Sequence, residues 1–125
     1  MYRIEKIGEK NFYIKVLGTL PPSVARRLVN ELGEELKNLT DYSVIVDGCD
    51  FIFLKLDSFE IILEFLKKNN EALYRSAYIV SKNPPLDIEI QYILDKADSP
   101  KRKIVNNLED AKKWIGISDI VIQRD

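Results

Sequence analysis

Apolar residues follow two alternating spacings along this chain. Short runs rich in β-branched and aromatic residues predict strands, and longer stretches with an apolar residue at every third or fourth position predict helices. The predicted strands cover residues 2–6, 12–17, 42–46, 74–80 and 103–105. The predicted helices begin near residues 22, 57, 86 and 108. The chain therefore opens with two strands and then alternates helix and strand.

This order predicts one α/β domain over residues 1–125. The first two strands are joined by the short turn Gly8–Asn11, which is typical of an antiparallel hairpin, and we expect Gly18 to end it. Each later strand is reached through a helix, and such crossovers place the strands side by side in one sheet. We therefore expect a mixed β-sheet with an opening hairpin and about four covering helices.

Turn and cap residues mark the expected ends of several elements. We expect Asp47-Gly48 to stop the central strand. Asn107 is placed to cap the last helix, and Gly116 is placed to end it. The apolar segment Ile117–Ile122 fits either an added edge strand or a docked tail, and the sequence leaves that choice open.

Charge and composition narrow the class of partner. The 19 basic and 20 acidic residues nearly cancel, so no strong positive field would hold a nucleic-acid backbone. An apolar fraction of 46% suits one buried core, and no apolar run approaches the ~20 residues of a membrane span. The N-terminal residues carry charge throughout, unlike a signal peptide. We expect a soluble cytoplasmic protein that neither binds nucleic acid nor inserts stably into a membrane.

Residue counts also bear on chemistry. The chain has no histidine, which removes the usual general base near neutral pH and the usual zinc ligand. Its one cysteine, Cys49, excludes an intramolecular disulfide and multi-cysteine metal sites. The five glycines stand apart, so no glycine-rich phosphate loop is present. We expect a protein that is not an enzyme and uses no cofactor or metal, with an enzyme based on carboxylates as the remaining alternative.

Polar residues at strand ends give a candidate ligand site. Asp47 and Cys49 follow the central strand, and Asn83 follows the next one. Open α/β sheets often bind ligands at this edge, which makes a small pocket lined by these three residues a hypothesis, with ordinary connecting loops as the alternative. Asp47, Asp50 and Asp57 could together hold a magnesium ion, but we favour turn-forming carboxylates there.

Three further features have a functional and a structural interpretation. The basic run Pro100–Lys103 would suit an anionic headgroup or an acidic partner, but a solvated loop is favoured for so short a run. Trp114 is expected to anchor the last helix against the sheet. We expect Cys49 to be a small buried hydrophobe rather than a reactive thiol.

The element order resembles that of a STAS domain, the fold of bacterial anti-sigma-factor antagonists, and so does the stretch YSVIVDGCDFIFLKLDSFEIILEFLKK. In that family an Asp-Ser-Ser-Gly type step at a helix N-terminus carries a serine that a partner kinase phosphorylates. Asp57-Ser58 matches its first two positions, and Phe59-Glu60 replaces the Ser-Gly pair. The resemblance implies a phosphorylation or partner site at Ser58, Asp57 and Asp47, with a kinase or sigma-factor regulator as the protein partner.

Two later stretches are similar to the SpoIIAA-like branch of the same fold, namely YRSAYIVSKNPP and VNNLEDAKKWIG. That branch shares its architecture with lipid-binding CRAL-TRIO domains. As an alternative function, the resemblance therefore implies a carrier or sensor of a small apolar or amphipathic ligand.

Ser58 itself has two interpretations. A phosphate in the first turn of a helix would meet free backbone N–H groups and the positive end of the helix dipole. Alternatively, Asp57 caps the helix and Glu60 completes a capping box, which leaves Ser58 as a first-turn residue, and we favour this interpretation. Our leading hypothesis is a non-catalytic regulatory or protein-interaction module that meets its partner near residues 47–60. The sequence does not predict an oligomeric state.

Overall fold

A computed structural model describes residues 1–54, 56–80 and 84–124, with the side chains of all but residues 52–54. The strands are β1 (Tyr2–Gly8), β2 (Asn11–Leu20), β3 (Tyr42–Leu54), β4 (Leu73–Ile79) and β5 (Arg102–Val105). The helices are α1 (Pro22–Leu36), α2 (Leu56–Lys68), α3 (Pro84–Ala97) and α4 (Leu108–Ile115). Within these ranges no helix has both the length and the apolar character needed to cross a membrane.

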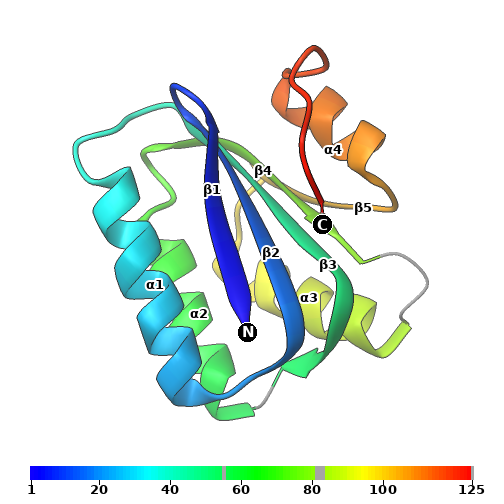
Figure 1. The fold of residues 1–125 in the computed structure, drawn as a ribbon. Coiled ribbons are helices and arrows are strands. Elements are labelled where there is room, and N and C mark those ends of the chain that lie inside the picture. Colours follow the sequence, from blue (N-terminus) through cyan, green and yellow to red (C-terminus); the bar gives the residue numbers. More distant parts are fainter. Residues whose placement is uncertain (55, 81–83, 125) are drawn as a thin grey trace.

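The strands form one sheet in chain order, β1-β2-β3-β4-β5. β1 and β2 are antiparallel, and β2, β3, β4 and β5 are parallel to one another. Figure 1 shows α1, α2 and α3 on one side of the sheet, with α4 and the C-terminal segment on the other. The predicted α/β fold, a mixed sheet with an opening hairpin and four helices, is confirmed.

Alternation of side chains along each strand divides the apolar residues between two cores. Phe12, Ile14 and Val16 of β2 belong to the larger core, beneath α1, α2 and α3, and this side is called the α1–α3 face. Tyr13 of β2 belongs to the smaller core, beneath α4 and the C-terminal segment, and this side is called the α4 face. Neighbouring residues of one strand therefore serve different cores.

Helix α1 shows how the sequence directs this packing. Pro22 stands at its first position, where a fixed φ and a missing N–H suit the start of a helix. Four residues that recur at helical spacing, Ala25, Leu28, Leu32 and Leu36, are buried against the sheet. Burying each of these leucines contributes about 2 kcal/mol of hydrophobic free energy, so the amphipathic pattern holds the helix in place.

Two strands run further than the sequence predicted. β2 continues to Leu20 through Gly18, which has a φ of 66° and lies at a shift in the pairing with β3. β3 continues through Asp47-Gly48 to Leu54 and pairs in parallel with the last residues of β2. The pairing of β2 with β1 ends at Val16, before Gly18 as expected, but Gly18 does not end the strand. The expectation that Asp47-Gly48 stops the central strand is wrong. Pairing with a long neighbouring strand outweighs the local preference of these residues for turns.

The last helix is capped as predicted. The Asn107 side chain accepts the Asp110 backbone N–H at 2.8 Å, and Gly116 closes the helix in the left-handed conformation with a φ of 78°. Residues 117–124, here called the C-terminal tail, form no strand and pack against the smaller core through Ile117, Ile120 and Ile122. The open choice for this segment is thereby settled as a docked tail.

Candidate functional site

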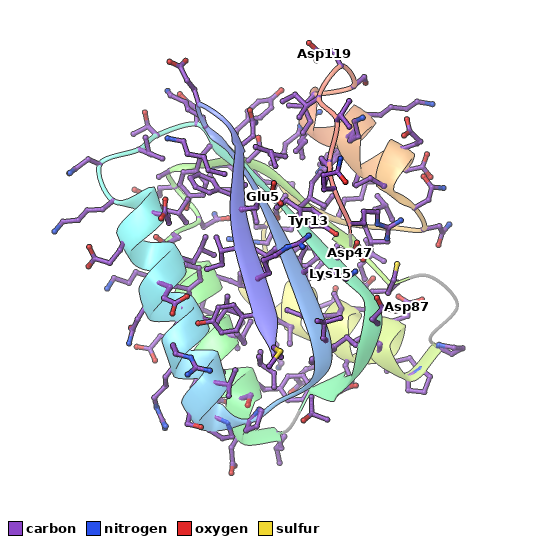
Figure 2. All side chains as sticks on the ribbon, in the orientation of Figure 1. Glu5, Tyr13, Lys15, Asp47, Asp87 and Asp119 are labelled. Carbon is purple, nitrogen blue, oxygen red and sulfur yellow. The ribbon has the colours of Figure 1, made fainter. Side chains whose placement is uncertain are left out.

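A buried carboxylate, Asp47, lies on the α4 face of β3, and only 1% of it is exposed. The parallel register aligns Tyr13 with Ile45 and Lys15 with Asp47. Residues two apart on a strand point to the same face, so β2 brings Tyr13 and Lys15 to the side of the sheet that holds Asp47. Figure 2 shows these side chains close together beside the C-terminal tail.

Among the described residues, three donors bond the Asp47 carboxylate. The Tyr13 hydroxyl donates to Oδ2 at 2.5 Å, Arg124 Nε donates to the same oxygen at 2.8 Å, and the Cys49 backbone N–H donates to Oδ1 at 3.1 Å. Burial by itself would raise the pKa of Asp47, but the hydrogen bonds from Arg124, Tyr13 and Cys49 outweigh burial and lower this pKa to about 2. Asp47 is therefore ionised in the folded protein at neutral pH.

The C-terminal tail closes over this carboxylate. A guanidinium nitrogen of Arg3, on β1, donates to the Gln123 carbonyl at 2.7 Å, and Lys15 Nζ donates to the Arg124 carbonyl. Arg124 Nη2 also lies 3.1 Å from Cys49 Sγ. Residues of β1, β2 and β3 thus hold the tail through both its backbone and its arginine side chain.

These contacts determine what the cluster can do chemically. Burial, together with the charge and hydrogen bonding of Asp47, raises the pKa of the Tyr13 phenol and of the Cys49 thiol. Hydrogen bonding to Asp47 raises the pKa of the Arg124 guanidinium. A general base works best with a pKa near the working pH, and a reactive cysteine needs a stabilised thiolate. The four side chains meet neither condition, and the Asp47 carboxylate and the Arg124 guanidinium form an ion pair at the centre of the cluster.

Two of the three residues predicted to line a small ligand pocket are brought together. Asp47 and Cys49 share Arg124 as a hydrogen-bond donor, while Asn83 lies outside the described residues. The pocket lined by these residues stays a prediction.

Ser58 lies on the other side of the sheet from Asp47. Its side chain is fully buried, and its hydroxyl donates to the Leu20 carbonyl at 2.5 Å, which ties the first turn of α2 to the end of β2. A kinase could reach this hydroxyl only after the first turn of α2 had opened. Ser58 and Asp47 therefore do not form one site, since the sheet separates them.

Asp57 does not cap helix α2 as the sequence predicted. Helix α2 begins at Leu56, which places Asp57 inside the first turn with its side chain exposed. A carboxylate in the first turn still interacts favourably with the helix dipole. The capping box predicted from Asp57 and Glu60 is therefore wrong, because both residues lie within the helix.

The three aspartates considered for magnesium are not gathered in the structure. Over residues 1–54, 56–80 and 84–124, no three carboxylate or thiol side chains are grouped so that they could hold a metal ion. Asp50 instead faces Lys15, with its Oδ2 3.5 Å from Nζ and 61% of its side chain exposed. Asp47 is already committed to Arg124 and Tyr13.

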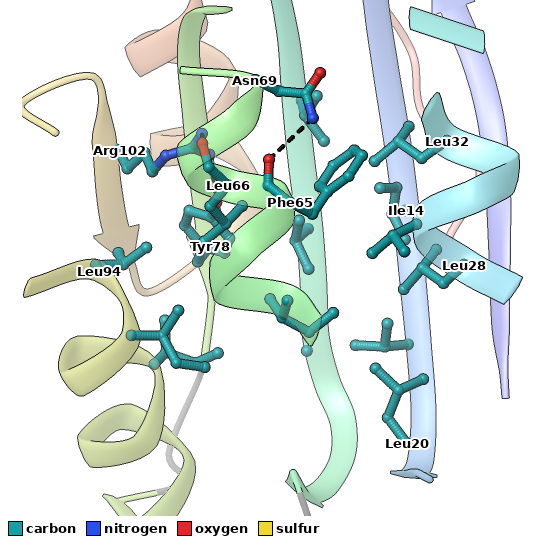
Figure 3. Close-up of a pocket in the computed structure, with 18 of the residues that line it drawn as sticks. Ile14, Leu20, Leu28, Leu32, Phe65, Leu66, Asn69, Tyr78, Leu94 and Arg102 are labelled. Atoms are coloured by element: carbon teal, nitrogen blue, oxygen red, sulfur yellow. Dashed lines mark hydrogen bonds between the residues drawn. The ribbon is translucent and has the colours of Figure 1, made fainter. Parts of the chain in front are cut away.

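An apolar cavity of about 120 Å³ lies between the sheet and helices α1, α2 and α3. Figure 3 shows side chains from these elements converging on it, among them Ile14, Leu28 and Leu94. At its polar end, Arg102 donates to the Leu66 carbonyl at 2.9 Å and to the Tyr78 hydroxyl at 3.0 Å. Pockets for drug-sized ligands hold roughly 300–1,000 Å³, so this cavity suits only a molecule about the size of benzene.

Apolar side chains are exposed where α2 begins beside α3. Leu56 is 79% exposed, Ile88 71% and Tyr92 57%. Tyr92 packs edge-on against Phe59, with the ring centroids 6.0 Å apart, which joins the two helices. Leu56 lies one turn from Phe59, and Ile88 lies one turn from Tyr92, so each pair shares a helix face. We call these four residues the α2–α3 patch.

The sequence interpretation missed Tyr13, Lys15 and Arg124 as partners of Asp47. A usable signal exists for the first two, because alternate residues of a paired strand share one face and a buried carboxylate requires hydrogen-bond donors. Arg124 is 77 residues from Asp47 and carries no local signal. Only the docking of the C-terminal tail brings it to the site.

No protein-family model and no curated protein matches this chain, but solved structures do. An uncharacterised protein of the DUF3478 family with a SpoIIAA-like fold, from Shewanella loihica PV-4, has a TM-score of 0.70 and 18% identity over 92% of each chain. The anti-sigma factor antagonist SpoIIAA in its unphosphorylated form has a TM-score of 0.60 and 11% identity, over 88% of this chain and 92% of that one. The predicted architecture is confirmed, and the chain has a SpoIIAA-like fold.

Proposed function

We propose that the protein is a non-catalytic regulatory module that binds a partner protein through the α2–α3 patch. The observation that carries this proposal is the exposure of Leu56, Ile88 and Tyr92 around the contact between Phe59 and Tyr92. Large apolar side chains that gather on neighbouring helices commonly mark an interaction surface. The patch also overlaps the region near residues 47–60 that the sequence favours for partner binding.

The border of the patch has the chemistry of an interface rim. Asp57 and Glu60 are exposed on α2, and Asp87 is exposed in the first turn of α3. Interfaces commonly combine an apolar centre with a charged, solvated rim. Lys96 Nζ also lies 5.6 Å from the Tyr92 ring centroid, so the rim carries both signs, with the carboxylates in excess. This excess favours a partner whose own rim is mainly basic, because complementary charges speed association and select against other partners.

The fold and the polar cluster support the same class of function. SpoIIAA is described as an anti-sigma factor antagonist, so the likeness in fold favours a protein partner, such as a kinase or sigma-factor regulator. Ser58 is already hydrogen-bonded to Leu20, which favours partner binding that does not depend on a phosphate at this position. The pKa shifts of Tyr13 and Cys49 favour a non-catalytic role, because both groups stay neutral near pH 7.

The test compares the proteins that three immobilised forms retain from cells of the source organism. The forms are the wild type, the double variant Leu56→Ser/Tyr92→Ser, and Val121→Ser, whose side chain is 81% exposed on the C-terminal tail. We expect a protein that the wild type and Val121→Ser retain equally and that the double variant loses by about tenfold or more. Melting temperatures establish that all three forms are folded. Equal retention by the three folded forms would contradict the proposal.

A second candidate function, a carrier of a small apolar molecule, is favoured by the cavity beneath α1, α2 and α3. Its volume of about 120 Å³ restricts the cargo to a compact apolar molecule and disfavours an amphipathic lipid. Benzene is a suitable probe, since a ligand that binds the folded state raises the melting temperature. An unchanged melting temperature at saturating benzene would show that the cavity is a packing gap.

A further inference from the structure

The groove between β5 and α4 differs in chemistry from the α2–α3 patch. Its volume is about 440 Å³, and its lining includes three cationic side chains, Arg75, Lys103 and Lys113, against one carboxylate, Asp110. Asp110 is partly engaged by the Asn107 side-chain amide at 3.3 Å. The groove is therefore positive, although the chain as a whole is almost neutral.

Trp114 forms a fixed aromatic wall in this groove. Its indole Nε1 donates to the Ser76 carbonyl at 2.9 Å, which confirms the predicted anchoring of the last helix to the sheet. The Arg75 guanidinium lies 4.2 Å from the ring centroid, and Lys103 Nζ lies 5.2 Å from it. Contact with the ring positions both cations beside the groove, so these side chains would lose little conformational freedom when an anion binds.

The three basic residues at positions 101–103 make different contacts in the structure. Lys101 Nζ donates to the Asn70 carbonyl at 2.9 Å, and Arg102 donates to the Leu66 carbonyl at 2.9 Å. These two side chains therefore brace the end of α2. Only Lys103 of this run lines the groove, where Arg75 and Lys113 from neighbouring elements join it.

The backbone of β5 provides a second independent feature. β5 is the last strand in the described sheet and pairs on one side only, with β4. Ser76 N–H donates to the Lys101 carbonyl, and Val80 N–H donates to the Val105 carbonyl, so these odd-numbered residues face β4. Backbone groups alternate in direction along a parallel strand, which turns those of Arg102 and Ile104 outward. An outward row of this kind accepts an added strand.

We propose that the groove between β5 and α4 binds an extended acidic segment of a partner protein. The segment pairs with the outer edge of β5 through its backbone, and its carboxylates contact Lys103, Lys113 and Arg75. Strand addition supplies affinity through backbone hydrogen bonds, while alternate side chains supply specificity. The positive groove selects an acidic segment over a neutral one. This surface is separate from the α2–α3 patch and adds a second contact for protein partners.

Trp114 is the only tryptophan, so its fluorescence reports binding in the groove directly. The probe is a synthetic octapeptide of alternating Glu and Val, and the matched peptide replaces each Glu with Gln. We expect a saturable fluorescence change with the Glu peptide, at least tenfold weaker binding of the Gln peptide, and weaker binding as salt rises. Lack of a saturable change, or equal binding of the two peptides, would overturn the proposal.

Variants separate the electrostatic and the strand-addition parts. Lys103→Gln and Lys113→Gln are expected to weaken binding of the Glu peptide about threefold to tenfold each, whereas Lys68→Gln, at an exposed lysine of α2, leaves it unchanged. A Glu peptide that is N-methylated at alternate residues cannot pair along one edge and should bind at least tenfold more weakly. Equal binding of the methylated peptide, or equal effects of all three lysine variants, would contradict the proposal.

Two further measurements distinguish peptide binding in the groove from binding of a small anion and from binding at the α2–α3 patch. Inorganic phosphate alone is expected to cause no fluorescence change at the concentration at which the Glu peptide saturates. A change with phosphate but not with the peptide would assign the groove to a small anion and overturn the proposal. The variant Leu56→Ser/Tyr92→Ser should bind the Glu peptide like the wild type, which keeps this test independent of the α2–α3 patch.

Discussion

The α1–α3 face and the α4 face of the same sheet hold their covering elements in different ways. On the α1–α3 face, three helices pack through an apolar core that includes a cavity, and the buried Ser58 is satisfied by a neutral hydrogen bond. On the α4 face, a short helix and the C-terminal tail cover a smaller core that contains an ionised carboxylate. Apolar packing on the first face leaves a gap, with the Arg102 guanidinium held at its end by Leu66 and Tyr78, whereas the charged cluster on the second face fixes one position of the tail.

The largest expected effect is that of a charge placed in the α1–α3 face. Ser58→Glu puts a longer, ionised side chain where the structure leaves no exposed surface. We expect a loss of more than about 4 kcal/mol in the free energy of unfolding, because the charge is buried and the hydrogen bond to Leu20 is lost. Urea denaturation measures this loss, with Ser118→Glu on the exposed tail as the control. Near-wild-type stability of Ser58→Glu would show that the first turn of α2 opens readily.

Removal of a charge from the α4 face ranks second. Asp47→Ala leaves the Arg124 guanidinium and the Tyr13 hydroxyl without their acceptor. The expected loss is about 3 kcal/mol in the free energy of unfolding, measured by urea denaturation. Asp50→Ala is the matched control, since Asp50 is 61% exposed, and we expect it to lose less than about 0.5 kcal/mol. Equal losses in the two variants would contradict a stabilising role for the buried cluster.

The same carboxylate makes stability depend on pH. The pKa of Asp47 is lowered from an ordinary value of 3.8 to about 2 in the folded protein, so the unfolded chain takes up the proton first as pH falls. The stabilisation is complete above about pH 5 and is lost as pH falls from about 4 through about 2, with a total of about 2 kcal/mol. Unfolding free energies of wild type and Asp47→Asn should therefore converge in acid. A constant difference between them down to pH 2 would disprove this linkage.

A larger side chain should change the stability of the protein in opposite directions on the two faces. Val44 lines the cavity, so Val44→Ile fills part of it and is expected to stabilise the protein by up to about 1 kcal/mol. Ala77 is fully buried in the smaller core, and Ala77→Val is expected to destabilise by about 1 kcal/mol through overpacking. Thermal denaturation of the two variants measures the difference. Destabilisation by both would mean that the cavity cannot accept even one methylene group.

The smallest effect concerns the tail itself. The Arg124 side chain is 37% exposed, so solvent weakens its interaction with Asp47. We expect Arg124→Gln to cost about 1 kcal/mol or less in global stability and to speed hydrogen exchange of the backbone amides at residues 120–124. Amides of β3 serve as the internal control and should exchange at unchanged rates. Unchanged exchange in the tail would mean that Ile117, Ile120 and Ile122 hold it in place without Arg124.

Much of the fold could be predicted from local patterns, but the polar contacts could not. The spacing of Leu28, Leu32 and Leu36 predicts α1, and Asn107 with Gly116 delimits α4, because these signals act within one element. The ends of β2 and β3 were missed because their pairing with each other decides them. The burial of Ser58 also depends on a distant partner, because its hydroxyl bonds the carbonyl of Leu20, 38 residues earlier. Asp47 and Cys49, predicted to line a pocket, both bond Arg124, a residue that the pattern of the central strand does not reveal.

The order of strands in the sheet has a consequence for synthesis of the protein. Each strand pairs with the one made just before it, so the sheet can grow outward as the chain leaves the ribosome. The tail breaks this order, since the bond between Arg3 and Gln123 joins residues 120 positions apart. Until the tail emerges, Asp47 lacks Arg124 as a partner, and α4 alone covers the smaller core. A nascent chain therefore leaves part of the smaller core uncovered on the α4 face until residues 117–124 are made, and a chaperone could bind this apolar surface in that interval.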